Sequence, residues 1–225
     1  MAIAREGISH KWGANIGKMI LEGGSDFGRT KQAYAAAGSD ARMSGCSLPV
    51  MINSGSGNQG ITLSVPLILE ADHMGTDHEN LVRSLVFANL IGLYLKSGIG
   101  KLSAYCGAMS AASAGAAGIA FLHGENGDVI RGTLTNTLAS LSGVVCDGAK
   151  PSCAMKIGMA VGTGEIAYRQ AKSGNTFHAG DGIVKKDVDD TIHTVSVIAH
   201  DGMKETDNII LEEMLRKIIT GKYHH

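Results

Sequence analysis

The chain has 225 residues, a formal net charge of −1, and 20 basic and 21 acidic residues spread evenly along its length. No basic run or stripe is present, which argues against nucleic acid or an anionic membrane surface as a partner. Aromatic residues make up only 4% of the chain, whereas glycine occurs 31 times. We therefore expect a core of closely approaching helices held by Ala, Leu, Ile and Met contacts rather than by stacked rings.

The longest uncharged run lies between Lys101 and His123, and its length approaches that of a membrane span. It consists mostly of Ala, Ser and Gly, which insert poorly, so we expect a buried helix and no membrane partner. The first seven residues lack a signal-peptide pattern, and we expect a cytoplasmic protein. In that reducing compartment the four cysteines favour metal binding or catalysis over disulfide bonds.

Helical patterns dominate from the first residues onward, and no run alternates in the manner of a strand. In chain order we expect helices over 29–43, 77–97, 103–122, 131–145, 151–172, 184–200 and 206–220. In the second of these, Thr76 and Glu79 form a capping-box pattern, and apolar residues cover most of the circumference, which predicts a central helix. The predicted fold class is mainly α, a compact multi-helix domain over 1–221. Residues 222–225 form a tail to which we give no function.

A loop rich in Gly, Ser and Asn covers 49–60 and leads into the apolar run 61–69. Such a loop at a helix start directs backbone N–H groups at an anion such as a carboxylate or phosphate. It lacks the signatures of a Walker loop and of a dinucleotide-binding loop. An ordinary loop with a helix cap is the alternative interpretation. Just upstream, Arg42 is a candidate to clamp a carboxylate, with Asp40 holding it or capping a turn. A surface ion pair stays equally open.

Two Asp-His pairs within 72–79 suggest a metal site, but residues 77–79 form the first turn of a predicted helix. Acidic residues favour the helix dipole there, so we expect a structural role for this segment. Cys46 has no cysteine near it in sequence and is expected to be a small buried hydrophobe.

The other three cysteines, Cys106, Cys146 and Cys153, are the strongest candidates for a site. Thiolates are soft ligands for zinc or iron–sulfur clusters. The chain has no Cys-x-x-Cys pair, which argues against a zinc ribbon or a thioredoxin-type site. Three cysteines without a fourth suit a four-iron cluster that keeps one iron open to substrate. Three unrelated buried thiols, or a structural zinc site completed by one histidine, stay open.

Taken together, these motifs resemble the L-cysteine desulfidases, which belong with the alpha-chain type of iron–sulfur L-serine dehydratases. The resemblance covers nearly the whole chain and is carried by residues 39–43, 49–60, 106–107, 146–153 and 182–207. It implies a [4Fe–4S] cluster held by Cys106, Cys146 and Cys153. Their separations of 40 and seven residues suit the desulfidases. The serine dehydratases have a Cys-Asp-Pro segment and a longer gap before the last cysteine.

The resemblance implies a lyase that eliminates sulfide from L-cysteine to give pyruvate and ammonia, with an L-serine dehydratase as the alternative. Arg42, Ser54, Ser56 and Asn58 would bind the substrate, and Lys150 would offset the charge of the cluster or serve as a fallback base. The chain would correspond to the C-terminal half of the family. The N-terminal half, in cis or in trans, would carry the catalytic base. A homo-oligomer is expected, and a non-catalytic scaffold or cluster-holding subunit is the second class.

Overall fold

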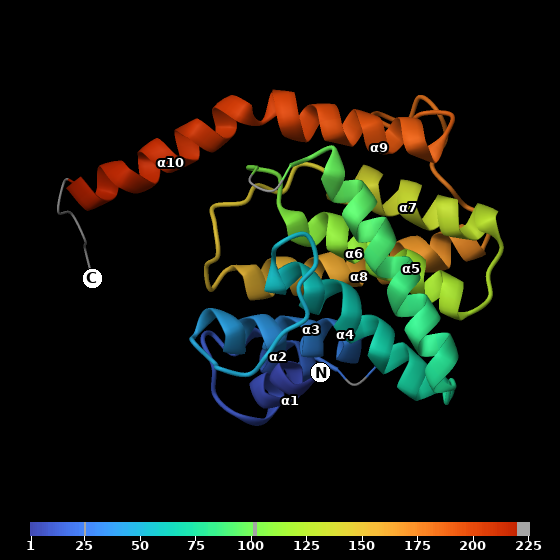
Figure 1. The fold of residues 1–225 in the computed structure, drawn as a ribbon, viewed down its shortest axis with the longest axis horizontal. Coiled ribbons are helices and arrows are strands. Elements are labelled where there is room, and N and C mark those ends of the chain that lie inside the picture. The colour runs from blue at the N-terminus through green and yellow to red at the C-terminus, as the bar shows by residue number, and fades with distance from the viewer. Residues whose placement is uncertain (25, 101–102, 220–225) are drawn as a thin grey trace.

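The computed structural model describes residues 1–24, 26–100 and 103–219, and these residues form a bundle of helices (Figure 1). In chain order the elements are α1 Ala2–Ser9, α2 Ile16–Glu22, α3 Phe27–Met43, α4 Gly57–Met74, α5 His78–Ser97, α6 Gly107–Leu122, α7 Gly127–Leu141, α8 Cys153–Lys172, α9 Val188–Val197, the π-helix η1 Ile198–Gly202 and α10 Lys204–Ile219. No strand occurs in the described ranges, and the mainly α prediction is confirmed. The predicted tail, 222–225, lies outside them.

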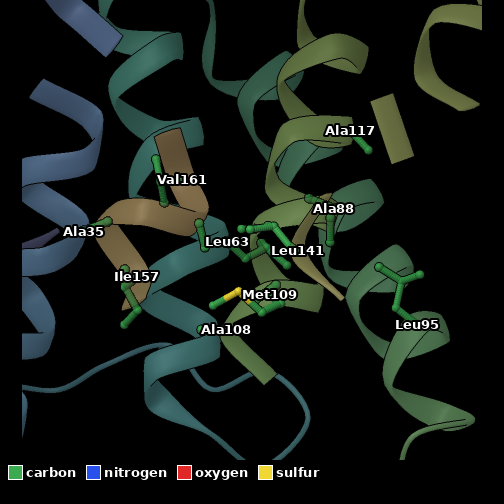
Figure 2. Close-up of a cluster of buried hydrophobic side chains, with 14 of the residues drawn as sticks. Ala35, Leu63, Ala88, Leu95, Ala108, Met109, Ala117, Leu141, Ile157 and Val161 are labelled. Carbon is green, nitrogen blue, oxygen red and sulfur yellow. The ribbon is translucent and has the colours of Figure 1, made fainter. Parts of the chain in front are cut away.

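The centre of the bundle is α6, which packs against α4, α5, α7 and α8. Thirteen of its 16 residues are buried, and most of them are Ala, Gly or Ser. Small residues let neighbouring helices come close: a Cβ added at Gly115 would lie 3.1 Å from the backbone oxygen of Leu63. Figure 2 shows Met109 of α6 among side chains from α4 and α8. The predicted core of small and aliphatic residues is confirmed.

The prediction that 77–97 is the central helix is wrong, because α5 lies at the surface. Its buried side carries Ser84, Ala88, Gly92, Leu95 and Lys96. Its large apolar side chains point outward, and Leu90 is 61% exposed. The others on that face are Val82, Val86, Leu93 and Tyr94. The apolar pattern identified a helix, but close approach to α6 requires small residues, so the stripe of small side chains faces inward.

Caps explain where the helix boundaries differ from the predicted ones. Asp77, rather than Thr76, is the N-cap of α5, and its carboxylate accepts the Asn80 backbone N–H at 2.9 Å. α7 begins at Gly127, four residues before the predicted start, because the Asn126 side chain caps it by accepting two backbone N–H bonds. α9 begins at Val188, four residues after the predicted start, because the Asp187 side chain caps it by accepting the Asp189 N–H. Each cap supplies the acceptor that a first helical turn lacks.

A buried ionic cluster ties four helices together at a distance from the loops. Lys31 of α3, only 2% exposed, donates to Glu70 of α4 and to Glu165 of α8. The second oxygen of Glu70 lies 2.9 Å from Nε2 of His123, the residue that ends α6. Every charge in this cluster has a partner, as buried charges require. No described helix is long and apolar enough to cross a bilayer.

Candidate functional site

Three cysteines that are far apart in sequence line one pocket of about 300 Å³. Cys106 is the N-cap of α6 and is 5% exposed, Cys153 is the first residue of α8, and Cys146 lies in the connection before α8. The Cys106 and Cys146 thiols are close enough for each to shift the pKa of the other. The structure therefore brings the predicted ligand candidates around a common space, at the end of the bundle where the α7–α8 and α3–α4 connections lie (Figure 1).

Backbone pairing between two distant segments sets the positions of Cys106 and Cys146. The Cys106 N–H donates to the Val144 carbonyl at 3.0 Å, and the Cys146 N–H donates to the Ala104 carbonyl at 2.6 Å. Tyr105 and Val145 form the isolated bridge between these bonds. The pairing is why α6 begins at 107 rather than at the predicted 103, since residues 104–106 serve the bridge instead.

The two paired thiols have opposite pKa shifts. The hydrogen bond from Cys106 lowers the pKa of Cys146 to about 6, with further help from the Gly148 backbone N–H and the charge of Lys156, against the effect of burial. The same hydrogen bond and burial raise the pKa of Cys106. The directions of these shifts favour Cys146 as the thiolate of the pair, and the thiolate is the form that binds metals.

Two lysines that the sequence analysis did not select lie at this pocket. Lys156 of α8 donates to the Asp147 carboxylate at 2.9 Å and to the Val145 carbonyl at 3.0 Å, which holds the Cys146 loop. Lys96, in the last turn of α5, is buried in the wall. Lys150, the predicted charge-offsetting residue, is exposed and does not line the pocket. The sequence signal for Lys96 was a lysine in the last turn of an apolar helix. A lysine at that position is usually explained by the helix dipole, so it did not indicate a site.

The opposite wall of the pocket is the loop before α4, with Arg42 behind it. Ser54 and Gly55 have positive φ angles of 50° and 80°, and Ser56 caps α4 by accepting the Gln59 N–H at 3.4 Å. Arg42 donates to the Asn58 side-chain oxygen at 3.1 Å. The four predicted substrate-binding residues, Arg42, Ser54, Ser56 and Asn58, thus line the same pocket as the cysteines. Their role in substrate binding stays a prediction.

Neither Asp40 nor Cys46 belongs to this pocket. Asp40 is buried and accepts the Gly17 N–H of α2 at 3.0 Å, so it caps a helix start instead of holding Arg42. Burial raises the pKa of Asp40 against the effect of that bond. Cys46 is half-buried, not fully buried as predicted, and packs at the edge of the core.

Three cysteine thiols are the type of ligand that iron–sulfur clusters use. Within the described ranges, no three or more His, Cys, Asp or Glu side chains converge closely enough to hold one metal ion. A cluster spreads its cysteine ligands over several irons, so they need not converge on one point. No histidine is among the described residues of the pocket lining, which disfavours the zinc alternative.

The surroundings also suit a negatively charged group. Cys106 and Cys153 stand at the starts of α6 and α8, where helix dipoles favour anions. Gly148 has a φ of 90°, and its N–H bonds to the Cys146 sulfur. A side chain at Gly107 would meet the Gln59 amide at 2.5 Å, so glycine keeps the two walls close.

Comparison with known proteins places the chain in a family. The serine dehydratase alpha chain family matches residues 1–212, and the chain belongs to it. A UPF0597 protein of Desulfitobacterium hafniense is 52% identical over 217 residues, covering 96% of this chain and 50% of that protein. A UPF0597 protein of Finegoldia magna is 48% identical over 215 residues, covering 96% of this chain and 52% of that protein.

A third UPF0597 protein, from Lachnoclostridium phytofermentans, is 50% identical over 214 residues, covering 95% of this chain and 51% of that protein. The chain therefore spans about half the length of the curated relatives that it matches. No solved structure matches it. The family is established by these matches, while the names of the relatives state neither a substrate nor a reaction.

Proposed function

We propose that the chain is the cluster-holding half of an iron–sulfur lyase that eliminates sulfide from L-cysteine. The observation that carries this proposal is the meeting of Cys106, Cys146 and Cys153 at one pocket whose other wall carries Arg42 and Asn58. Membership of the serine dehydratase alpha chain family supports a lyase acting on a small amino acid. A cytoplasmic location and a homo-oligomeric state remain predictions.

The reaction removes the Cα proton of L-cysteine and breaks the Cβ–S bond, and the sulfur leaves with the bonding electron pair as sulfide. The resulting aminoacrylate tautomerises and takes up water to give pyruvate and ammonia. A [4Fe–4S] cluster would supply a Lewis-acidic iron for the leaving sulfur. The resemblance to the desulfidases favours cysteine. The alternative is L-serine, with hydroxide leaving in place of sulfide.

The residues of this chain would bind and orient the substrate. The Arg42 guanidinium suits a carboxylate, and its bond to Asn58 fixes its direction. Ser54 and Gly55 have positive φ angles and line the same pocket, and backbone N–H groups of such a turn would suit an anion. We assign the catalytic base to no described residue. The exposed position of Lys150 makes it a poor base, because a base must reach the substrate in the pocket.

Anaerobic reconstitution followed by iron and sulfide counting tests the cluster. Ser replacements of Cys106, Cys146 and Cys153 should each lose it, whereas Cys46→Ser, a cysteine outside the pocket, should keep it. Retention of the cluster by all three pocket variants would remove the proposal. A cluster is visible by its absorbance, so the test does not depend on activity.

The substrate is tested by measuring sulfide and pyruvate release from L-cysteine. The assay is run with and without the part of the relatives' chains that lies beyond the match, because this chain spans half of their length. Turnover of L-serine alone would reassign the enzyme as a dehydratase. The half-length span also favours a second candidate, a cluster-holding subunit inactive by itself. Cluster binding without turnover in either assay would support that candidate.

A further inference from the structure

Two lysines are buried among the described residues, and they differ in their surroundings. Lys31 donates to the carboxylates of Glu70 and Glu165. Lys96 is 6% exposed and, among the residues that the structure describes, makes no ion pair or hydrogen bond through its side chain. Instead it faces the pocket lined by the three cysteines.

The Lys96 side chain is buried, its ammonium keeps exposed surface at the pocket, and no carboxylate pairs with it. Such a position is costly, because desolvation disfavours the charged form. Burial lowers the pKa of Lys96, and the charges of Cys146 and Cys106 oppose that effect. The carbonyl end of α5 makes only a small favourable contribution to a cation at this position. Neither the packing of α5 nor its dipole therefore explains why a lysine rather than an apolar residue occupies this wall.

The other cations near the cysteines are already engaged or lie elsewhere. Lys156 is paired with Asp147 and the Val145 carbonyl. Arg42 is bonded to the neutral amide of Asn58, and we assign its charge to the carboxylate of the substrate. Lys96 thus supplies the pocket with a positive charge that no described carboxylate neutralises. An anion bound beside the cysteines would complete this arrangement.

We propose that Lys96 is the counter-charge of an anionic thiolate-ligated cluster held by Cys106, Cys146 and Cys153. Three thiolates carry more negative charge than an oxidised [4Fe–4S] core carries positive charge, and a neighbouring cation stabilises that excess. The inference rests on the proposed function and deepens it. It makes Lys96 a positioning and charge-tuning residue, not a catalytic one.

The test replaces Lys96 by Met, which keeps the length of the apolar stem and removes the charge, and by Arg, which keeps the charge. In the metal-free chain, Lys96→Met should raise the thermal unfolding midpoint, because a largely desolvated charge that no carboxylate neutralises is lost. In the reconstituted chain it should shift the midpoint potential of the cluster to a lower value and speed iron release to a chelator several-fold. Lys96→Arg should restore both properties.

Two controls separate charge from structure. Lys186→Met removes a positive charge at an exposed position outside the pocket and should leave the potential unchanged. Lys31→Met makes the same substitution at a paired buried lysine and should lower the unfolding midpoint. The opposite sign of the two buried substitutions distinguishes a residue kept for a ligand from one kept for the fold.

An unchanged potential and iron-release rate in Lys96→Met, with full iron content, would overturn the inference while leaving the proposed function intact. A lower unfolding midpoint of the metal-free variant, or its failure to fold, would overturn it as well, because Lys96 would then be structural. Failure of the unsubstituted chain to assemble any cluster would reject the proposed function and this inference together.

Discussion

Gly60 joins the core to the candidate site, and its replacement by Ala should destabilise the protein. Gly60 lies in the first turn of α4, directly against the strand-like segment that leads into the pocket loop. A Cβ at this position would lie 1.8 Å from the Met51 carbonyl oxygen, 2.5 Å from the Met51 carbonyl carbon and 3.1 Å from the Ile52 nitrogen. All three are backbone atoms, so no rotation of a side chain can relieve the clash.

The size of the effect follows from these distances. Carbon and carbonyl oxygen come ordinarily no closer than about 3.3 Å, so the loop would have to move by about 1.5 Å. Overpacking of this kind costs about 1–3 kcal/mol, and the rigid backbone places Gly60→Ala at the upper end. Higher helix propensity returns about 1 kcal/mol. The net loss is then about 2 kcal/mol, which lowers the unfolding midpoint by about 4–8 °C in a chain of this size.

Thermal and urea unfolding of Gly60→Ala measure this loss. Gly202→Ala is the matched control, because a Cβ there would meet no atom within 4 Å, and its stability should stay the same or rise slightly. The loop shift should also reduce cluster uptake, since Ser54 and Ser56 of the same loop line the pocket. A Gly60→Ala variant as stable as the unsubstituted chain would show that the close packing of α4 on this loop is misjudged.

Three further predictions concern titration and charge. Iodoacetamide should alkylate Cys146 of the metal-free chain, and the alkylation rate should be half-maximal near pH 6. Cys106→Ala should shift this half-maximal pH upward, because Cys106 is the main cause of the lowered pKa of Cys146. Peptide mass spectrometry of the alkylated chain measures both values. Lys31→Met should cost about 3 kcal/mol in urea unfolding, because Glu70 keeps a buried charge without its partner. Burial raises the pKa of Glu70, but Lys31 and then His123 lower this pKa by a larger amount, so the net shift is downward. The contribution of the Glu70 carboxylate to stability is complete above the ordinary glutamate pKa and should disappear as the pH falls through the lower folded-state pKa. Acid unfolding curves that are the same for Glu70→Gln and for the unsubstituted chain would contradict this prediction.

Most of the helices could be predicted from sequence, although α1 and α2 lie outside the predicted ranges, but the arrangement of the helices could not. The periodicity in 77–97 and the small-residue run after Cys106 each indicate a helix, and both helices are present. Hydrophobic content suggested that the first of them is central, whereas the structure buries the second. Helices approach most closely through Ala, Gly and Ser, so the helix with the smaller side chains occupies the centre and Leu90 of α5 faces outward. The periodicity of a single helix does not show which of two helices packs more closely against its neighbours.

The site divides in the same way between local and long-range information. Cysteine chemistry selected Cys106, Cys146 and Cys153 as candidates, and the glycine-rich loop drew attention to the residues on the facing wall. Their shared pocket depends on the pairing of 104–106 with 144–146, which no spacing rule predicts. Lys96 and Lys156 were missed for the same reason, since a lysine becomes informative only when its surroundings are known.

The two buried lysines show how such surroundings separate function from stability. Lys31 is neutralised by carboxylates of the same chain, so its charge stabilises the fold and needs nothing else. Lys96 has a similar degree of burial but faces cysteines, one of which has its pKa lowered to about 6. A thiolate at Cys146 already offsets part of that charge, and a thiolate-ligated cluster would offset more. A fold selected for stability alone would place an apolar residue at position 96, so the lysine indicates an anion that the site binds.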